Sequence, residues 1–285
     1  MTAKLAWPSL LLAGLLWPAA PLAAPADLAY GAYQRGDHAT AMREAQKRVE
    51  ANPRDAAALS LIGRLYAEGA SVPRDAKIAA TWFRRAADTG DPNGSYLYGA
   101  SLLQGKSGVQ ERKIAKTYLE RAAAQNHGAA LNLLGEMALD SGDLVGGRGF
   151  FKRGAEAGDA DAAYAMGEMS KHGKGAEKND AEAARWFADA AKQDHSGALV
   201  ELAIIKFNVE HDPAAAAELL RKAAKLGNAV AQNRLAYLLA RGDGAPRDLA
   251  EAEKLRDLSR AQGLEDPGLD ELLARSGPPL RREAK

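Results

Sequence analysis

The 285-residue chain contains no cysteine, and only 6% of its residues are aromatic. Without cysteine, the protein cannot form disulfide bonds, thiolate nucleophiles or metal sites with cysteine ligands. Lys and Arg number 38 against 37 Asp and Glu, so the chain lacks the basic excess that a nucleic-acid-binding surface needs. The catalytic patterns H-E-x-x-H and G-x-S-x-G are also missing, and no serine is followed by a lysine three positions later. We therefore expect a non-enzymatic protein that uses no cofactor or metal and does not bind nucleic acid.

Alanine is the residue that the chain has in excess, with 63 copies in a chain that is 47% hydrophobic. Alanine has the highest helix propensity, and its small side chain lets neighbouring helices approach closely. The length would by itself suggest about two domains. The excess of alanine and the shortage of aromatic residues instead indicate closely packed helices rather than an enzyme with a large pocket.

Residues 1–26 have the pattern of a secretory signal peptide. Lys4 is the only charge before Asp27, and the apolar segment Leu10–Trp17 lies between them. The triplet Ala24–Ala26 fits the small-residue exit of such a peptide, so we predict cleavage between Ala26 and Asp27 and export to the periplasm. The alternative is an uncleaved membrane anchor, against which the prolines of this segment argue.

Two residue patterns recur along the chain with the same steps. In the first, a small residue is followed five positions later by Gly63, Gly99, Gly135, Gly167, Ala203 or Ala236, at steps of 36, 36, 32, 36 and 33 residues. In the second, pairs of large apolar residues step by 36, 32, 36 and 33 residues: Trp82-Phe83, Tyr118-Leu119, Phe150-Phe151, Trp186-Phe187 and Leu219-Leu220. Because two independent patterns share these steps, the chain is predicted to be a repeat array.

Each repeat is predicted to be a pair of helices, with the glycine or alanine on the first helix and the large apolar pair on the second. A glycine inside a helix costs about 1 kcal/mol, so we expect these glycines where the neighbouring helix approaches closely. The units of Gly135 and Ala203 lack four and three residues between their two helices. The fold prediction is all-α, an α-solenoid of about seven antiparallel hairpins with a C-terminal capping helix.

The repeat steps also divide the chain into segments. After the signal peptide (1–26), residues 27–53 are predicted to form a degenerate, tetratricopeptide-like hairpin. Residues 54–263 form the main array. Residues 264–285 contain a short capping helix, which covers the last apolar face, and a mobile tail.

One stretch of the array has a characteristic set of residues: Tyr66, Gly69, Val72, Asp75, Lys77, Ala80, Trp82-Phe83, Ala86-Ala87 and Gly90. This set resembles a Sel1-like repeat, a hairpin related to tetratricopeptide repeats. A second clear copy surrounds Trp186-Phe187, and Gly242 with Pro246 and Asp248 marks a third. The resemblance covers residues 54–263. It implies a right-handed superhelix that holds other proteins, in roles such as envelope regulation or exopolysaccharide assembly. We accordingly expect a monomer that binds a periplasmic or envelope protein and touches the membrane only through its partners.

In hairpins of this kind the inner, concave wall is formed by positions of the first helix that packing leaves free. The candidates for partner binding lie at three positions relative to each recurring glycine or alanine: three residues before it, one residue after it, and one helical turn after that. Tyrosine and arginine are favoured anchors at protein interfaces. The predicted partner-binding residues are Arg64, Tyr96, Asn132, Glu136, Tyr164, Glu168, Lys171, Phe207, Asn233 and Tyr237. The alternative is that the tyrosines are partly buried packing residues.

Two other functional classes stay open. A cell-wall or polysaccharide-binding module would need a trough lined by acidic or aromatic side chains. A cell-wall hydrolase would need a tight Ser/His/acid or Glu/Glu cluster in one pocket. The segment Gly105–Ser107 matches a permissive phosphate-loop pattern, but it follows a predicted helix instead of the strand that this chemistry requires.

Overall fold

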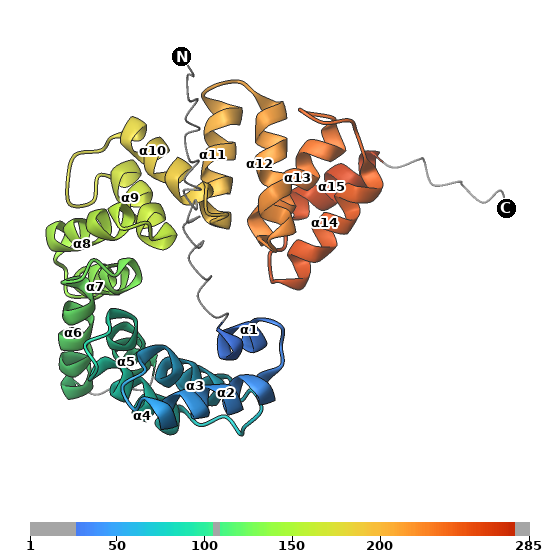
Figure 1. The fold of residues 1–285 in the computed structure, drawn as a ribbon. Helices are drawn as coiled ribbons and strands as arrows, with labels where there is room; N and C mark the ends of the chain where they lie inside the picture. The colour runs from blue at the N-terminus through green and yellow to red at the C-terminus, as the bar shows by residue number, and fades with distance from the viewer. Residues whose placement is uncertain (1–26, 105–108, 277–285) are drawn as a thin grey trace, which may run out of the picture.

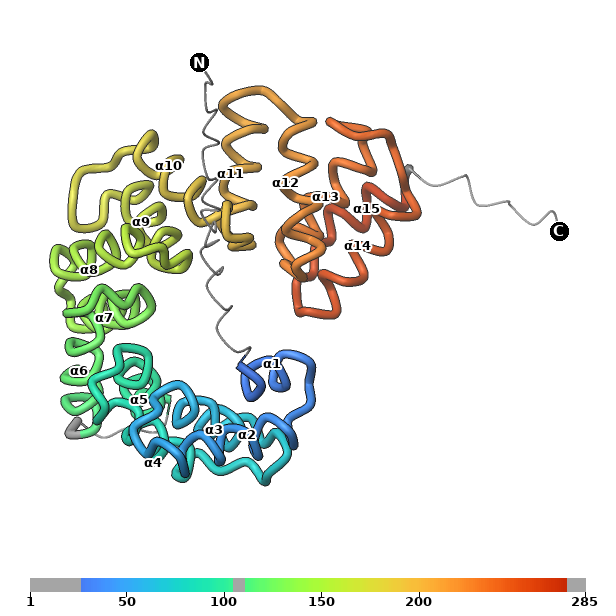
Figure 2. The backbone as a smooth tube through the Cα atoms, in the orientation of Figure 1, coloured from blue at the N-terminus to red at the C-terminus, as the bar shows by residue number. Residues whose placement is uncertain are grey.

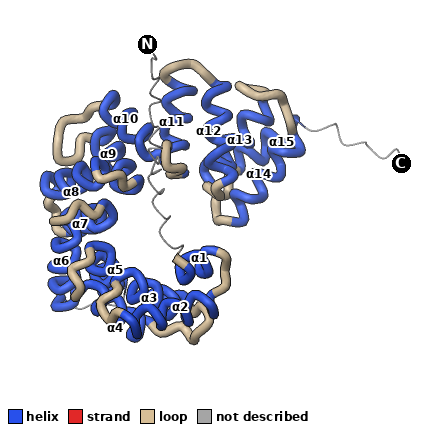
Figure 3. Tube along the Cα trace, viewed as in Figure 1, coloured by secondary structure: helices blue, strands red, loops and turns tan. Residues whose placement is uncertain are grey.

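The computed structural model describes residues 27–104 and 109–276. Within these residues the protein is entirely α-helical, as predicted, with 15 helices and no strand (Figure 3). The signal peptide predicted for residues 1–26, the Gly105–Ser107 motif and the tail predicted for residues 277–285 lie outside the described residues. The helices are α1 (Leu28–Gln34), α2 (His38–Ala51), α3 (Ala56–Glu68), α4 (Ala76–Ala87), α5 (Pro92–Gln104), α6 (Val109–Ala123), α7 (Gly128–Asp140), α8 (Leu144–Glu156), α9 (Ala160–His172), α10 (Asp180–Ala191), α11 (Ser196–Asn208), α12 (Pro213–Lys225), α13 (Ala229–Arg241), α14 (Leu249–Ala261) and α15 (Pro267–Ser276).

Helices α1 to α14 form seven successive hairpins, which confirms the predicted architecture. The hairpins stack into an open arc, with α1 near one end and α15 near the other (Figure 1). Helix α15 packs on α13 and α14 and buries Leu269 and Leu273, so it covers the last hairpin as a cap should.

The odd-numbered helix of each hairpin, here called the first helix, lies on the inner side of the arc. Successive first helices contact one another at α3–α5, α5–α7, α7–α9 and α13–α15, as expected on the shorter side of a curved array. Helix α11 makes no comparable contact with α9 or α13. The backbone trace shows α3, α5, α7 and α9 inside, with α4, α6 and α8 outside them (Figure 2).

Local sequence signals account for where the helices begin and end. A side-chain acceptor caps the N-terminus of most of them: Asp55 accepts from the Ala58 amide of α3, and Asn179 accepts from the Glu182 amide of α10. Three first helices end at a glycine with left-handed backbone: Gly69, Gly173 and Gly242.

Three of the four recurring glycines lie where the second helix of the same hairpin presses an aromatic ring against the first, and at the fourth, Gly99, the facing side chain is Leu119. A Cβ atom added at Gly63 would lie 2.5 Å from Cε1 of Phe83, and one at Gly135 would lie 2.7 Å from Cε1 of Phe151. Gly167 meets Phe187 in the same way. These glycines are therefore the predicted contact points, since only a hydrogen leaves room for the ring.

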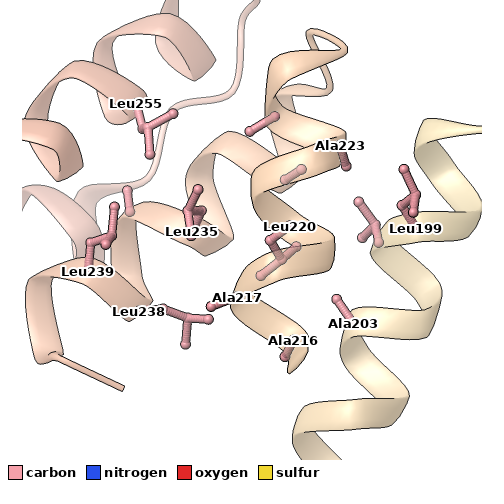
Figure 4. Packing of buried hydrophobic residues seen from close by; sticks show 14 of the residues in the cluster. Leu199, Ala203, Ala216, Ala217, Leu220, Ala223, Leu235, Leu238, Leu239 and Leu255 are labelled. Carbon is pink, nitrogen blue, oxygen red and sulfur yellow. The ribbon is translucent and has the colours of Figure 1, made fainter. Parts of the chain in front are cut away.

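Where the small position is alanine, the facing side chain is smaller. In the α11–α12 hairpin Ala203 takes the place of glycine, and Leu220 takes the place of the phenylalanine. Figure 4 shows Leu220 of α12 between Ala203 of α11 and the leucines of α13. The Ala203–Leu220 pair thus has roughly the same volume as the glycine–phenylalanine pairs, whereas the Gly99–Leu119 pair of the α5–α6 hairpin is smaller.

The connections inside the hairpins differ in length as the repeat steps predict. The long loops 69–75, 173–179 and 242–248 contrast with 141–143 and 209–212, which are four and three residues shorter. Two long loops pack back on the start of the preceding second helix, where Gly175 lies against the Leu144 carbonyl and Gly244 against the Pro213 carbonyl. The α7–α8 and α11–α12 hairpins lack this contact segment.

Candidate functional site

The predicted partner-binding residues all lie on first helices, but the structure does not bring them together in one site. They occupy three positions of the repeat: three residues before the small position, one residue after it, and one turn further on. Arg64 lies on α3, Tyr96 on α5, Asn132 and Glu136 on α7, Tyr164, Glu168 and Lys171 on α9, Phe207 on α11, and Asn233 and Tyr237 on α13.

Tyr96 and Tyr164 stack on the residue that caps the next first helix. The ring of Tyr96 lies 4.8 Å from the ring of His127, and the ring of Tyr164 lies 4.4 Å from that of His195. Each histidine accepts a backbone hydrogen bond through Nδ1, from Ala130 at 3.3 Å for His127 and from Ala198 at 3.1 Å for His195. Both tyrosines are partly buried, so they join consecutive hairpins, as the packing alternative anticipates.

Asn132 and Asn233 are buried, at 9% and 8% exposure, so the expectation that packing leaves them free is wrong. Asn132 Nδ2 donates to Glu136 Oε1 at 2.9 Å, and Asn233 Nδ2 donates to Asp266 Oδ2 at 3.1 Å. The buried amides are satisfied inside the protein, because an unpaired buried polar group would cost free energy. Neither side chain can clamp a partner's backbone in this conformation.

Burial shifts the titration of the groups in these junctions. It lowers the pKa of His127, because the charged imidazolium loses hydration there. It also raises the pKa of Tyr96, on which the charges of Arg64 and Glu136 act from the neighbouring first helices. Arg64, Tyr96 and Glu136 thus lie on the three successive first helices α3, α5 and α7.

The inner positions of α9 carry charges that pair with one another. Lys171 Nζ lies 2.5 Å from Glu201 Oε2 of α11 and 4.0 Å from Glu168 Oε1. His172 Nε2 lies 3.5 Å from Glu168 Oε2. Because these groups already have partners, a ligand would have to compete with them for Glu168 or Lys171.

A cleft of about 280 Å³ opens between α11 and α13 with α12 as its floor. Its apolar surface comes from all three helices, and Ala203, Ala216 and Leu238 lie near the same end of them (Figure 4). The predicted residues Phe207 and Tyr237 both line it, and Phe207 is 39% exposed. The lining residues are Ala203, Ile204, Phe207, Asn208, Ala216, Leu220, Arg234, Tyr237, Leu238, Arg241 and Asp243.

Two arginines border this apolar cleft. The guanidinium of Arg241 lies 5.6 Å from the centre of the Tyr237 ring. The Tyr237 hydroxyl donates to Asp266 Oδ1 at 3.0 Å, and burial together with this carboxylate raises the pKa of the tyrosine. Arg234 lies one turn before Tyr237 on α13 and is exposed. Neither arginine makes an ion pair within residues 27–104 and 109–276.

The sequence patterns predicted Phe207 and Tyr237 but missed Arg234 and Arg241. Their spacing was an available signal, because positions 234, 237 and 241 follow the i, i+3, i+7 spacing of one helix face. The shortened loop after α11 was a second signal for this cleft that the sequence offered. A pocket also lies beside the other shortened loop, at α7–α8, but there Arg112 pairs with Asp140 at 2.8 Å.

The described residues contain no group of three His, Asp or Glu side chains arranged to hold a metal ion. In the same part of the chain no helix combines the length and apolar character needed to cross a membrane.

The chain belongs to the Sel1 repeat family, which matches it over residues 56–91, 92–127, 160–195, 206–228 and 229–255. The matches omit residues 128–159, which include the α7–α8 hairpin with its shortened connection. They begin again after α9–α10 only at residue 206, near the end of α11. The first hairpin, α1–α2, precedes the first match, and from α3 to α14 the two hairpins with shortened connections fit the family model least.

Solved structures of similar fold include a Sel1 repeat protein from Oxalobacter formigenes. It is 24% identical, with a TM-score of 0.72, over 82% of this chain and 98% of that one. The protein c5321, described as a protective antigen of uropathogenic Escherichia coli with an SLR fold, is 26% identical with a TM-score of 0.65. That match covers 78% of this chain but only 49% of c5321.

A curated relative, the F-box protein At5g50450 of Arabidopsis thaliana, is 31% identical over 121 residues. The match covers 40% of this chain and 35% of the relative, so the chain spans only about a third of that relative's length. Sel1 and tetratricopeptide-like repeats are typically non-catalytic scaffolds that mediate protein–protein interactions through extended surfaces.

Proposed function

We propose that this protein is a non-enzymatic adaptor that holds a protein partner on the inner surface of its arc. The observation that carries the proposal is the inner row of first helices, on which Arg64, Tyr96 and Glu136 lie toward one end and the α11–α13 cleft toward the other. Such a surface is preformed, so binding costs little ordering of the adaptor itself.

We further propose that the adaptor works in the bacterial periplasm, in envelope regulation or exopolysaccharide assembly. The predicted signal peptide with cleavage before Asp27 supports export, and the lack of cysteine fits a protein whose stability rests on helix packing alone. Cell fractionation with N-terminal sequencing tests this step. A mature chain that starts at Asp27 in the periplasmic fraction is expected, whereas an intact N-terminus in the membrane fraction would overturn it.

Crosslinked capture from envelope fractions tests the binding function. The tagged protein should recover a specific partner, and the double variant Arg64→Glu/Glu136→Gln should lose it. Glutamine removes the charge of Glu136 but keeps an oxygen acceptor for the buried Asn132 amide, whereas substitution of Tyr96 or Tyr164 would disturb the stacked helix caps. The matched control is Arg185→Glu/Glu253→Gln, which makes the same changes at exposed positions of the second helices α10 and α14.

Circular dichroism should show equal helicity for both variants. Capture that is equally strong with the inner-surface variant and its control would contradict the proposal. Recovery of glycan without protein would instead favour the polysaccharide-binding alternative.

A further inference from the structure

The α11–α13 cleft has exposed apolar groups at its margin. Phe207, which lines it at the end of α11, is 39% exposed, and Val209 in the shortened loop 209–212 that follows is 70% exposed. Exposed apolar side chains that border an apolar cleft mark a place where another molecule can be buried. The volume of about 280 Å³ suits one or two side chains rather than a whole folded domain.

The charges at this cleft are unbalanced, unlike those of the neighbouring inner positions. Lys171 is paired with Glu201, and Lys206 with Glu210, whereas Arg234 and Arg241 have no ion-pair partner in the described part of the chain. Of the residues that line the cleft, Asp243 is the single described carboxylate, which leaves an excess of positive charge. An arginine beside an apolar surface binds carboxylates well, since its planar guanidinium is weakly hydrated.

The spacing of the two arginines limits what can bind both. They are seven residues apart on α13, which places their backbones about 10 Å apart along the helix axis. Phe207 and Tyr237 lie between the two helices that form the walls. A ligand that fits must therefore present an apolar group with negative charge on both sides of it.

Resting on the proposed adaptor function, we propose that the α11–α13 cleft binds an acidic-apolar peptide segment of the partner protein. One bulky apolar side chain of the segment enters the cleft between Phe207 and Tyr237, and flanking carboxylates pair with Arg234 and Arg241. Buried apolar anchors and arginine pairs of this kind carry most of the affinity at interfaces.

The chain's own C-terminal residues do not match these requirements. Residues 277–285 contain two arginines and one lysine against one glutamate, so their net charge has the same sign as the cleft. Like charges oppose binding, which favours a partner segment over the tail.

The test starts from random peptides of about twelve residues displayed on phage, panned against the purified full chain. Enriched peptides should carry an aromatic or large aliphatic residue between acidic residues. Labelled synthetic copies of one enriched peptide then give affinities by fluorescence anisotropy. The variant Arg234→Glu/Arg241→Glu should weaken binding by roughly thirtyfold or more, and Phe207→Ser by about tenfold.

A matched control makes the same charge change away from the cleft. Arg185→Glu/Lys254→Glu alters two exposed residues of α10 and α14 and should leave the affinity within about twofold. Raising the salt concentration should weaken the wild-type complex, since its ion pairs are partly exposed. Enrichment of basic peptides, a lack of any enrichment, or unchanged affinity of the Arg234→Glu/Arg241→Glu variant would overturn the proposal.

Partner capture distinguishes failure of the cleft proposal from failure of the adaptor proposal. If capture is lost with Arg64→Glu/Glu136→Gln but kept with Arg234→Glu/Arg241→Glu, the adaptor function stands and the role of the cleft is wrong. If the cleft binds acidic-apolar peptides but no envelope protein is captured, the adaptor function fails instead.

Discussion

The packing of glycine against phenylalanine gives the sharpest test of the fold. We expect Gly167→Ala to destabilise the protein, although alanine is the better helix former. A Cβ atom at this position would overlap the ring of Phe187, which is buried and cannot move away freely. Overpacking of this kind costs about 1–3 kcal/mol, and the gain in helix propensity returns about 1 kcal/mol. The net expectation is a loss of up to about 2 kcal/mol in the free energy of unfolding.

The chain offers a matched control and a compensating change. Gly149 lies inside α8, is exposed, and has open space where its Cβ would be, so Gly149→Ala should stabilise the protein by up to about 1 kcal/mol. The double variant Gly167→Ala/Phe187→Leu recreates the Ala203–Leu220 pair of the α11–α12 hairpin. It should recover about 1 kcal/mol relative to the sum of the two single changes.

Urea unfolding followed by circular dichroism at 222 nm measures these differences. Because repeat arrays can lose two-state behaviour, hydrogen exchange of the α9 and α10 amides should accompany it. Equal stabilisation by Gly167→Ala and Gly149→Ala would refute the close-contact explanation of the recurring glycines.

Three further predictions concern the junctions between helices. Burial lowers the pKa of His127 below its ordinary value of 6.5, so the unfolded chain binds the proton first and stability should fall as the pH drops below about 6.5. His127→Asn keeps a capping side chain that does not titrate, so the urea midpoint of this variant should change less between pH 7.5 and 5 than that of the wild type. An equal pH dependence in both proteins would count against the role of His127. Asp266→Ala removes the hydrogen-bond acceptor of the Tyr237 hydroxyl and of the Leu269 amide in the first turn of α15. It should therefore lower the free energy of unfolding by about 2–3 kcal/mol and speed amide exchange in α15 before other helices. Unaltered exchange in α15 would show that other contacts hold this capping helix. Arg48 pairs with Asp55 at 2.9 Å, but its side chain is one-third exposed, so Arg48→Met should lower the free energy of unfolding by only about 1 kcal/mol. A loss of stability that does not depend on salt concentration would argue against an electrostatic cause.

Much of the fold could be predicted from the sequence because its determinants are local or periodic. Helix ends depend on nearby residues, such as Asp55 before α3 and Gly69 after it. The contact between Gly63 and Phe83 lies within one hairpin, and the recurrence of this residue pattern along the chain predicts the repeat architecture. Even the shortened connections at 141–143 and 209–212 could be counted from the repeat steps.

The candidate site was only partly predictable, because its residues meet across hairpins. Counting along a helix placed Asn132 and Tyr96 on the inner side, but it could not show that Asn132 is buried or that Tyr96 stacks on His127 from the next hairpin. Burial and pairing of this kind depend on the angle between successive hairpins, which no single repeat encodes.

The sequence by itself therefore determined the helices, their pairing, the number of hairpins and the lack of cysteine chemistry. These follow from capping, helix propensity and the period of small residues, all of which act within a few turns of the chain. Only the tertiary structure decided which charges are neutralised and which stay free. Lys171 is paired because α11 brings Glu201 to it, whereas Arg234 and Arg241 border a cleft that opens where α11 and α13 separate.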